Sequence, residues 1–283
     1  MIPYDRFDVL SFDCYGTLID WESGIAAAAR FQLGDAVAAH SDEDLIAGFA
    51  AVEHDAEVPY KSYREVLALS LRGMGERLGF AVSDAQAAGF GSSVGQWPAF
   101  PDSGEALRRL QERFKLAVIT NCDDDLFAQS ERRLGVSFDH VITAQQAGSY
   151  KPDHANFLLA FERIEEPRER ILHVAQSLFH DHVPAKALGM TSVWIDRRQG
   201  RGGGASMEVE AHPDATFPSM AAFADDAGPA SRARSGVRHA TCVPDPKSCI
   251  TRRAGARPGG PAPRRSRGPA SRVVGLRRRR SAG

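Results

Sequence analysis

A single carboxylate, Asp13, stands where a short apolar run ends and a turn begins. Residues 7–12 are mostly apolar, and Gly16 and Thr17 follow the aspartate, a pattern typical of a buried parallel strand that ends in a loop. Open α/β sheets place their chemistry at the carboxyl ends of such strands. An aspartate there can act as a nucleophile, because a covalent intermediate divides one difficult step into two easier ones.

Three later loops that follow strand-like runs also carry polar side chains. These side chains are Thr120, Asn121, Lys151, Ser177 and Asp181. In an open sheet such loops converge, so we expect the side chains to gather near Asp13. A neighbouring lysine would keep Asp13 ionised, since a nearby cation lowers a carboxyl pKa by roughly 1–3 units.

Each of these side chains has an expected role. Thr17, Thr120 and Asn121 would donate hydrogen bonds to the carboxylate, the leaving group or a tetrahedral oxyanion. Asp181 would orient Lys151 or the hydrolytic water. The run from His180 to His182 places a carboxylate between two imidazoles, but without a third ligand it does not predict a zinc site.

The elements that must position these residues alternate between strand and helix. Strands are expected at 7–12, 115–120, 140–143, 171–175 and 192–195, and helices at 103–114, 125–134, 154–164 and 184–188. This alternation predicts an α/β fold with a doubly wound, parallel, Rossmann-like sheet and right-handed crossovers.

Residues 20–97 interrupt the alternation and have helical patterns throughout. Ser41 is a good N-cap followed by three acids, and apolar residues recur at helical spacing after Tyr63. We therefore expect an all-helical domain at 20–97, inserted into a catalytic core formed by residues 1–19 and 98–226.

The charge of the chain is divided between its two ends. Residues 227–283 contain 14 Arg, one Lys and one Asp, which leaves 20 basic and 35 acidic residues in 1–226. A basic tail can bind nucleic acid or an anionic surface. This one lacks apolar runs, so we interpret it as a disordered extension, for example from a frameshift in a GC-rich gene, and consider nucleic-acid binding unlikely.

The order Asp13, Thr120-Asn121, Lys151-Pro152 and Asp181, over residues 5–225, resembles the four motifs of the haloacid dehalogenase superfamily. The helices at 20–97 resemble the helical cap of that superfamily. The resemblance implies that Asp13 is a covalent nucleophile and that Asn121 lies at a halide-contacting position. Phosphatases of the superfamily carry a second Asp two residues after the first, whereas this chain has Tyr15, as in the 2-haloacid dehalogenase branch.

Tyr15 also bears on the reaction. A phosphate ester expels an alkoxide that needs a proton, and a tyrosine with a pKa of about 10 is a poor acid at neutral pH. Halide leaves without a proton. We therefore expect a hydrolase of the (S)-2-haloacid dehalogenase type, which needs no cofactor and gives a 2-hydroxy acid. Asp13, Thr17, Lys151 and Asp181 would be its catalytic residues.

The residues expected to bind the substrate are Tyr15, Thr120, Asn121 and Ser177. Two alternatives remain open. One is a phosphatase of a small metabolite, with Mg²⁺ held by Asp13 and Asp181. The other is a catalytically silent member that binds a small molecule or a protein partner.

Three departures from the family pattern concern the residues that bind the substrate. The family uses a cap arginine to hold halide, but residues 41–57 contain no Arg and six acids, and an acid facing the pocket would repel an anionic substrate. Lys61 or Arg64 is a possible substitute. Phe157 replaces a tyrosine, and Gln176-Ser177-Leu178 lacks the asparagine of the fourth motif.

Bulk properties are ordinary. The chain is 43% hydrophobic and 25% charged, without an apolar stretch of about 20 residues or a signal peptide. Its four cysteines do not form a disulfide framework, so we expect a reducing cytoplasm. The expected partner is a small anionic substrate, with no membrane association and a possible homodimer.

Overall fold

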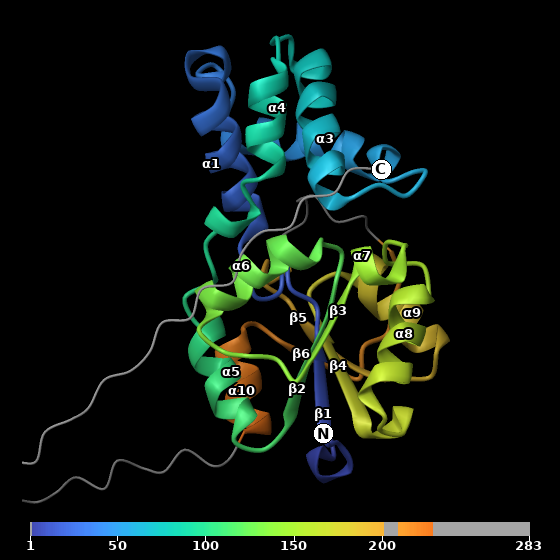
Figure 1. Ribbon diagram of the computed structural model, residues 1–283. Helices are drawn as coiled ribbons and strands as arrows, with labels where there is room; N and C mark the ends of the chain where they lie inside the picture. Colours follow the sequence, from blue (N-terminus) through green and yellow to red (C-terminus); the bar gives the residue numbers. More distant parts are fainter. Residues whose placement is uncertain (1, 201–208, 229–283) are drawn as a thin grey trace, which may run out of the picture. The chain divides into compact units, whose positions relative to one another are not determined.

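The computed structural model describes residues 2–200 and 209–228. Its central element is a six-stranded parallel sheet in the order β3-β2-β1-β4-β5-β6 (Figure 1). The strands are β1 (Val9–Phe12), β2 (Lys115–Thr120), β3 (His140–Thr143), β4 (Ile171–Ala175), β5 (Thr191–Ile195) and β6 (Ala215–Phe217). The α/β fold class predicted from the sequence is confirmed. Strands β2 and β3 are added on one side of β1, whereas β4, β5 and β6 are added on its other side. The carboxyl ends of β1 and β4 therefore form the crevice in which this architecture binds ligands.

Helices cover both faces of the sheet. The helices of the core are α5 (Ser103–Gln111), α6 (Asp124–Leu134), α7 (Ala144–Ala147), α8 (Ala155–Ile164), α9 (Val183–Ala187) and α10 (Met220–Ala227). In Figure 1, α5 and α10 lie on one side of the sheet, and α8 and α9 on the other. Short 3-10 turns, η1 (Tyr4–Arg6) and η4 (Arg168–Arg170), precede β1 and β4.

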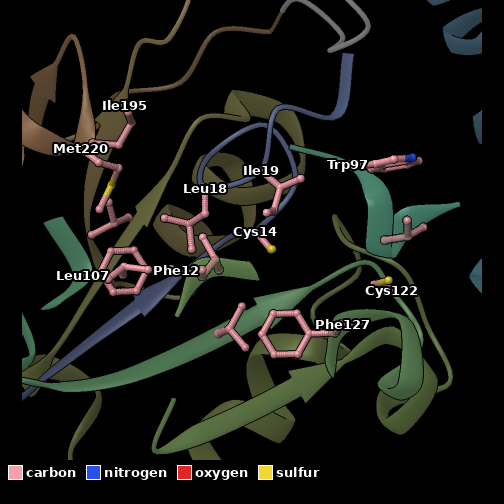
Figure 2. Close-up of a cluster of buried hydrophobic side chains, with 14 of the residues drawn as sticks. Phe12, Cys14, Leu18, Ile19, Trp97, Leu107, Cys122, Phe127, Ile195 and Met220 are labelled. Atoms are coloured by element: carbon pink, nitrogen blue, oxygen red, sulfur yellow. The ribbon is translucent and has the colours of Figure 1, made fainter. Parts of the chain in front are cut away.

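Strand β1 is buried on both faces and mostly apolar because each face packs against helices. Leu10 and Phe12 belong to the cluster that contains residues of α5, α6 and α10, whereas Val9 belongs to the cluster under α8. Figure 2 shows Phe12 among Leu107, Phe127 and other side chains of the first cluster. A continuous apolar run is what a strand buried on both faces requires. The result is a rigid base for the residue that follows the strand, Asp13.

The segment between β1 and β2, which we call the helical insertion, consists of helices. They are α1 (Trp21–Leu33), α2 (Asp42–Ala56), α3 (Tyr63–Leu78) and α4 (Asp84–Gly91), with 3-10 turns η2 (Gly34–Val37) and η3 (Val94–Gln96). Three of these helices begin with a capping box, in which a serine and an acid or glutamine three residues later satisfy each other's backbone N–H groups. Ser41, Ser62 and Ser83 are the capping serines. Local sequence therefore fixes where each helix starts.

The structure differs from the sequence-based expectation mainly at short elements. The expected run 7–12 forms a strand only from Val9, and the helix expected at 103–114 ends at Gln111. The elements α7, β6 and α10 were missed, because they span only three to eight residues. Ala227 ends α10 and is fully buried, so the tail expected from residue 227 begins too early. Residues 229–283 of that expected tail lie outside the described part of the chain.

Among residues 2–200 and 209–228, no helix has both the length and the hydropathy needed to cross a lipid bilayer.

Candidate active site

Asp13 leaves the sheet at the carboxyl end of β1 and is held on all sides. Its backbone N–H donates to the carbonyl of Val174 in β4 (3.1 Å). Its Oδ2 accepts from the Thr17 hydroxyl (2.6 Å), and the Thr17 oxygen in turn accepts from the backbone N–H of Gln176 (2.8 Å). The side chain is buried, with 6% exposure. One oxygen of the carboxylate is thereby oriented by the loop that Asp13 itself begins.

Lys151 supplies the positive charge beside Asp13. Its Nζ donates to Asp13 Oδ1 (2.9 Å), to Asp181 Oδ1 (2.6 Å) and to the Ile119 carbonyl (2.8 Å). An ammonium has three N–H donors, and all three are used. Although burial opposes the charge, the two carboxylates raise the pKa of Lys151. Lys151 is therefore a fixed, fully bonded cation.

The pKa of Asp13 shifts in the opposite direction to the one expected. Burial raises the pKa of its carboxyl, and this outweighs the lowering by the Lys151 ammonium and the Thr17 hydroxyl. The expected lowering by Lys151 is real, but the expected net direction is wrong because desolvation was left out. Burial disfavours any charged form, including that of a carboxylate with a cation beside it.

Asp181 completes the charged cluster. It lies in η5 (Leu178–His182), a π-helical turn, where the Ser177 hydroxyl accepts the N–H of His180 (3.1 Å). Asp181 Oδ1 contacts both Lys151 and the Nε2 of His173 (3.1 Å). Burial would raise the pKa of Asp181, but Lys151 and His173 outweigh it and hold this pKa well below its usual range. Asp181 Oδ2 is buried and has no hydrogen-bond partner in the described part of the chain.

His173 was missed in the sequence analysis. It lies in β4, is fully buried and pairs its Nδ1 with the Ser11 hydroxyl of β1 (3.0 Å). A histidine within an otherwise apolar buried strand needs a polar partner, and that signal was available in the sequence. The residues of the run 180–182 diverge, since His182 pairs with Ser192 and the Ala175 carbonyl.

Asn121 positions Lys151 through the backbone. Its Oδ1 accepts the N–H of Lys151 (2.7 Å), and its Nδ2 donates to the Lys151 carbonyl (3.0 Å). The sequence predicts Asn121 as a substrate contact and does not indicate this reciprocal pair with the Lys151 backbone. Thr120 is fully buried, and its hydroxyl has no partner among the described residues.

A cavity of about 60 Å³ opens over these groups. It is lined by Asp13, Tyr15, Trp21, Glu53, Glu57, Tyr63, Asn121, Lys151, Gln176, Ser177, His180 and Asp181. Of the expected substrate-binding residues, Tyr15, Asn121 and Ser177 line this cavity and Thr120 does not. Tyr15 bonds to Ser130 through its hydroxyl (3.0 Å) and packs edge-on against Trp97.

The helical insertion contributes two carboxyl groups to the cavity, Glu53 of α2 and Glu57, the C-cap residue of that helix. Glu53 accepts the Tyr63 hydroxyl (3.0 Å). Burial raises the pKa of Glu53 to about 7 and that of Glu57 to about 8. The sequence signalled an acidic helix here, and the i, i+4 spacing puts these two acids on one helix face.

Neither expected substitute for the family's cap arginine lines the cavity. The Lys61 Nζ donates to the carbonyls of Ala56 and Pro59, and Arg64 is bonded to Ser92 and Asp125. That expectation is wrong, because both cations are engaged elsewhere on the insertion or the core. Within residues 2–200 and 209–228, no group of three or more His, Cys, Asp or Glu is arranged to hold a metal ion.

Comparison with known proteins bears on this cluster. The family model of haloacid dehalogenase-like hydrolases matches residues 7–182, which include Asp13, Lys151 and Asp181. The chain is 28% identical to (S)-2-haloacid dehalogenase H-109 of Pseudomonas putida, over 49% of this chain and 63% of that relative. It therefore spans less than two thirds of the length of that protein.

Two further relatives are matched over most of their length. Identity is 27% with haloacetate dehalogenase H-2 of Moraxella sp. (strain B), over 77% of this chain and 96% of the relative. It is also 27% with 5-amino-6-(5-phospho-D-ribitylamino)uracil phosphatase YigB of Escherichia coli (strain K12), over 70% and 87%. Proteins similar to this chain thus include both dehalogenases and a phosphatase.

A solved structure of L-2-haloacid dehalogenase from Xanthobacter autotrophicus shares the fold. The TM-score is 0.67 at 19% sequence identity, and the match covers 77% of this chain and 97% of that one.

Proposed function

The chain belongs to the haloacid dehalogenase-like hydrolases, and on that premise we propose that it hydrolyses its substrate through an ester formed on Asp13. The observation that carries this proposal is the contact of Asp13 Oδ1 with the Lys151 ammonium (2.9 Å) at the edge of a small cavity. A buried carboxylate that borders a cavity and has one defined cation beside it is suited to nucleophilic catalysis.

The proposed reaction is carbon–halogen cleavage of the 2-haloacid type. Asp13 attacks the carbon that bears the halogen, a carbon–oxygen bond forms, and halide leaves with the bonding electrons. Water then attacks the carbonyl carbon of the ester, which restores Asp13 and releases a 2-hydroxy product and a proton. Thr17 and Lys151 hold the carboxylate and favour negative charge on its oxygens in the second step. Asp181 positions Lys151.

Tyr15 supports halide rather than alkoxide as the leaving group. Burial raises its pKa well above 10, and its hydroxyl is paired with Ser130. A side chain with so high a pKa does not protonate a leaving group at neutral pH, and halide needs no proton. The dehalogenases among the similar proteins agree with this choice.

We further propose that the helical insertion covers the site. Glu53, Glu57 and Tyr63 of the insertion line the same cavity as Asp13. A cover of this kind would exclude bulk water and strengthen the electrostatic interactions in the cavity. The proposed cap corresponds to the segment 20–97 expected from the sequence.

A second candidate, a Mg²⁺-dependent phosphatase, is favoured by one observation. Asp181 Oδ2 is buried beside the site without a hydrogen-bond partner in the described chain, and a carboxylate oxygen is a suitable ligand for Mg²⁺. Asp13 and Asp181 would then hold the ion, which would neutralise charge on a transferring phosphoryl group. A phosphatase is among the similar proteins.

The test of the proposal is isotopic. A single turnover of 2-chloropropionate in H₂¹⁸O should place ¹⁸O in the carboxylate of Asp13, detected by mass spectrometry of the peptide that contains it. The Asp13→Asn variant should release no chloride while the protein remains folded. Asp225→Asn, a surface control, should behave like wild type.

The same assay separates the two candidates. Chloride release without added metal supports dehalogenation, whereas Mg²⁺-dependent cleavage of p-nitrophenyl phosphate supports the phosphatase. Direct incorporation of ¹⁸O into the product, with an unlabelled Asp13, would rule out the ester intermediate.

A further inference from the structure

The wall of the cavity that the helical insertion supplies carries two carboxyl groups, Glu53 and Glu57, which have no Lys or Arg in ion-pair contact among the described residues. Glu57 is 9% exposed and accepts no hydrogen bond within the described chain. The exposed imidazole of His54 lies beside it, with Nδ1 at 3.8 Å from the Glu57 Oε2. Glu53 has only the Tyr63 hydroxyl. A buried carboxyl, Glu57, and a partly buried one, Glu53, that border a cavity without a Lys or Arg partner have hydrogen-bonding capacity to offer a ligand.

The remaining charges in the cavity do not offset these acids. Lys151 is the single Lys or Arg among the lining residues, and its three N–H groups already bind Asp13, Asp181 and a backbone carbonyl. Burial lowers the pKa of His180 to about 4, so this imidazole is neutral at physiological pH. At pH values above about 8, where Glu53 and Glu57 are both ionised, a substrate carboxylate entering the cavity would therefore meet like charge and no free cation among the lining residues.

We propose that Glu53 and Glu57 are specificity-determining residues that select substrates in which the group bonded to the reacting carbon carries N–H donors, as a primary amide does, and that disfavour a free carboxylate there. This inference rests on the proposed function, since it places the substrate between Asp13 and α2. It replaces the small anionic substrate expected from the sequence with a 2-halogenated amide or a similar donor-bearing compound.

The selection follows from the chemistry of the two wall groups. A carboxylate accepts hydrogen bonds, and an amide NH₂ offers two donors. The same wall facing a substrate carboxylate brings like charges together in a poorly hydrated space, where their repulsion exceeds that in bulk water. An amide and an acid of the same carbon skeleton have nearly the same size, so the discrimination is electrostatic rather than steric.

The experiment compares (S)-2-chloropropionamide with (S)-2-chloropropionate at pH 9, where both glutamates are ionised. We expect wild type to prefer the amide by tenfold or more in kcat/KM. The double variant Glu53→Gln/Glu57→Gln should reduce this preference to within about threefold, chiefly by gaining activity on the acid. Faster turnover of the acid by wild type, or an unchanged preference in the double variant, would overturn the inference.

The matched control is Asp55→Asn. Asp55 is an exposed residue between the two glutamates on α2 and does not line the cavity, so its removal changes the charge of the helix but not the wall. It should leave the preference unchanged. Asp13→Asn reports chloride released by alkylation of thiols, which is subtracted from the value for each variant; the two cysteines in the described part of the chain, Cys14 and Cys122, are buried.

A binding measurement keeps the inference separate from the proposed function. If neither compound releases chloride, dehalogenation fails as the function, and isothermal titration with the products lactamide and lactate tests the wall alone. Wild type should bind lactamide at least tenfold more tightly than lactate, and the double variant should not distinguish them. Equal affinity for the two in wild type, or no binding of either, would refute the role of the wall.

Discussion

At the scale of single residues, Lys151 uses every hydrogen-bond donor it has. Its three ammonium hydrogens meet three acceptors, and the reciprocal pair with Asn121 fixes its backbone. Removing one member of a buried ionic cluster costs more than the cluster contributes, because the remaining charges lose their partner. The stability of the site and its chemistry therefore depend on the same side chain.

We predict that Lys151→Met lowers the free energy of unfolding by about 3–5 kcal/mol, since it leaves Asp13 and Asp181 as buried carboxylates without a cation. Turnover should fall on the order of a hundredfold or more, as for loss of one preorganised charge. Urea titration and steady-state kinetics measure the two effects. Lys115→Met, at an exposed lysine paired with Glu166, should change neither by much. A Lys151→Met protein with the unfolding free energy of wild type would contradict the burial of Asp13 and Asp181.

The pKa of Glu57, raised to about 8 by burial, predicts how stability depends on pH. Between about pH 4.5 and 8 the folded protein holds a proton that the unfolded chain releases, so this group makes stability fall as pH rises, with no further loss above pH 8. Glu57→Gln removes the effect.

The melting temperature of Glu57→Gln should therefore equal that of wild type at pH 4 and exceed it at pH 9. Each kcal/mol corresponds to about 2–4 °C for a domain of this size. Thermal scans at the two pH values, with Asp55→Asn as control, measure the difference. A variant that is less stable than wild type at pH 9 would show that the ionised carboxylate has a stabilising partner.

Whether the position of a site residue could be predicted from the sequence depends on how directly its secondary-structure element determines that position. Asp13 directly follows β1, and Lys151 comes after β3 and the short helix α7. Because parallel strand ends meet at one edge, their proximity could be predicted. The two glutamates of the cavity lie on α2 and at its C-cap, and which face of a helix points inward depends on how that helix packs against its neighbours. The bonds between Asn121 and Lys151 depend on loop geometry that the spacing of residues does not specify.

At the scale of elements, one carboxylate connects the helical insertion to the core. Asp123, in the loop after β2, accepts the backbone N–H groups of Tyr63 (2.9 Å) and Arg64 (3.0 Å) at the start of α3. The same residue is the N-cap of α6, where its side chain makes no capping bond. A favourable negative charge is thus placed at the N-terminus of α3 by a distant segment.

We predict that Asp123→Ala costs about 1–2 kcal/mol of stability, as for loss of a good N-cap, and also lowers kcat/KM because α3 is no longer tied to the core. The matched control is Ser62→Ala. Ser62 caps the same helix within the insertion, so its loss should reduce stability similarly without changing kinetics. Calorimetry and steady-state kinetics on both variants are the measurements. If the two variants lower kcat/KM equally, Asp123 does not act by holding α3 against the core.

The longer elements followed from the sequence because several local signals agreed. Helix α3 has a capping box, apolar residues at helical spacing and a glycine C-cap, Gly79, in a left-handed conformation. Strand β6 has three partly exposed or exposed residues and no such signal. The π-helical turn η5 was read as a loop leading into a helix, since the sequence gives no indication of a widened turn.

At the scale of the whole molecule, the described part of the chain forms a complete sheet by Ala227. Arg113 of the core donates to the Ala227 carbonyl (3.0 Å), and the last helix packs on α5. We predict that a protein ending at Gly228 keeps the melting temperature and turnover of the full chain. Differential scanning calorimetry and chloride release on the two proteins test this. A drop of several degrees in the shorter protein would show that residues 229–283 stabilise the fold.

The two amides held by Asp123 have a consequence for how motion in this protein can be observed. Neither N–H of Tyr63 or Arg64 has a preceding helical turn to bond to, so its protection from solvent depends on a carboxylate that belongs to another segment. Each separation of the two segments should therefore expose both hydrogens together. Their deuterium uptake, followed residue by residue, would count separation events in the resting protein and show whether a bound ligand makes those events rarer.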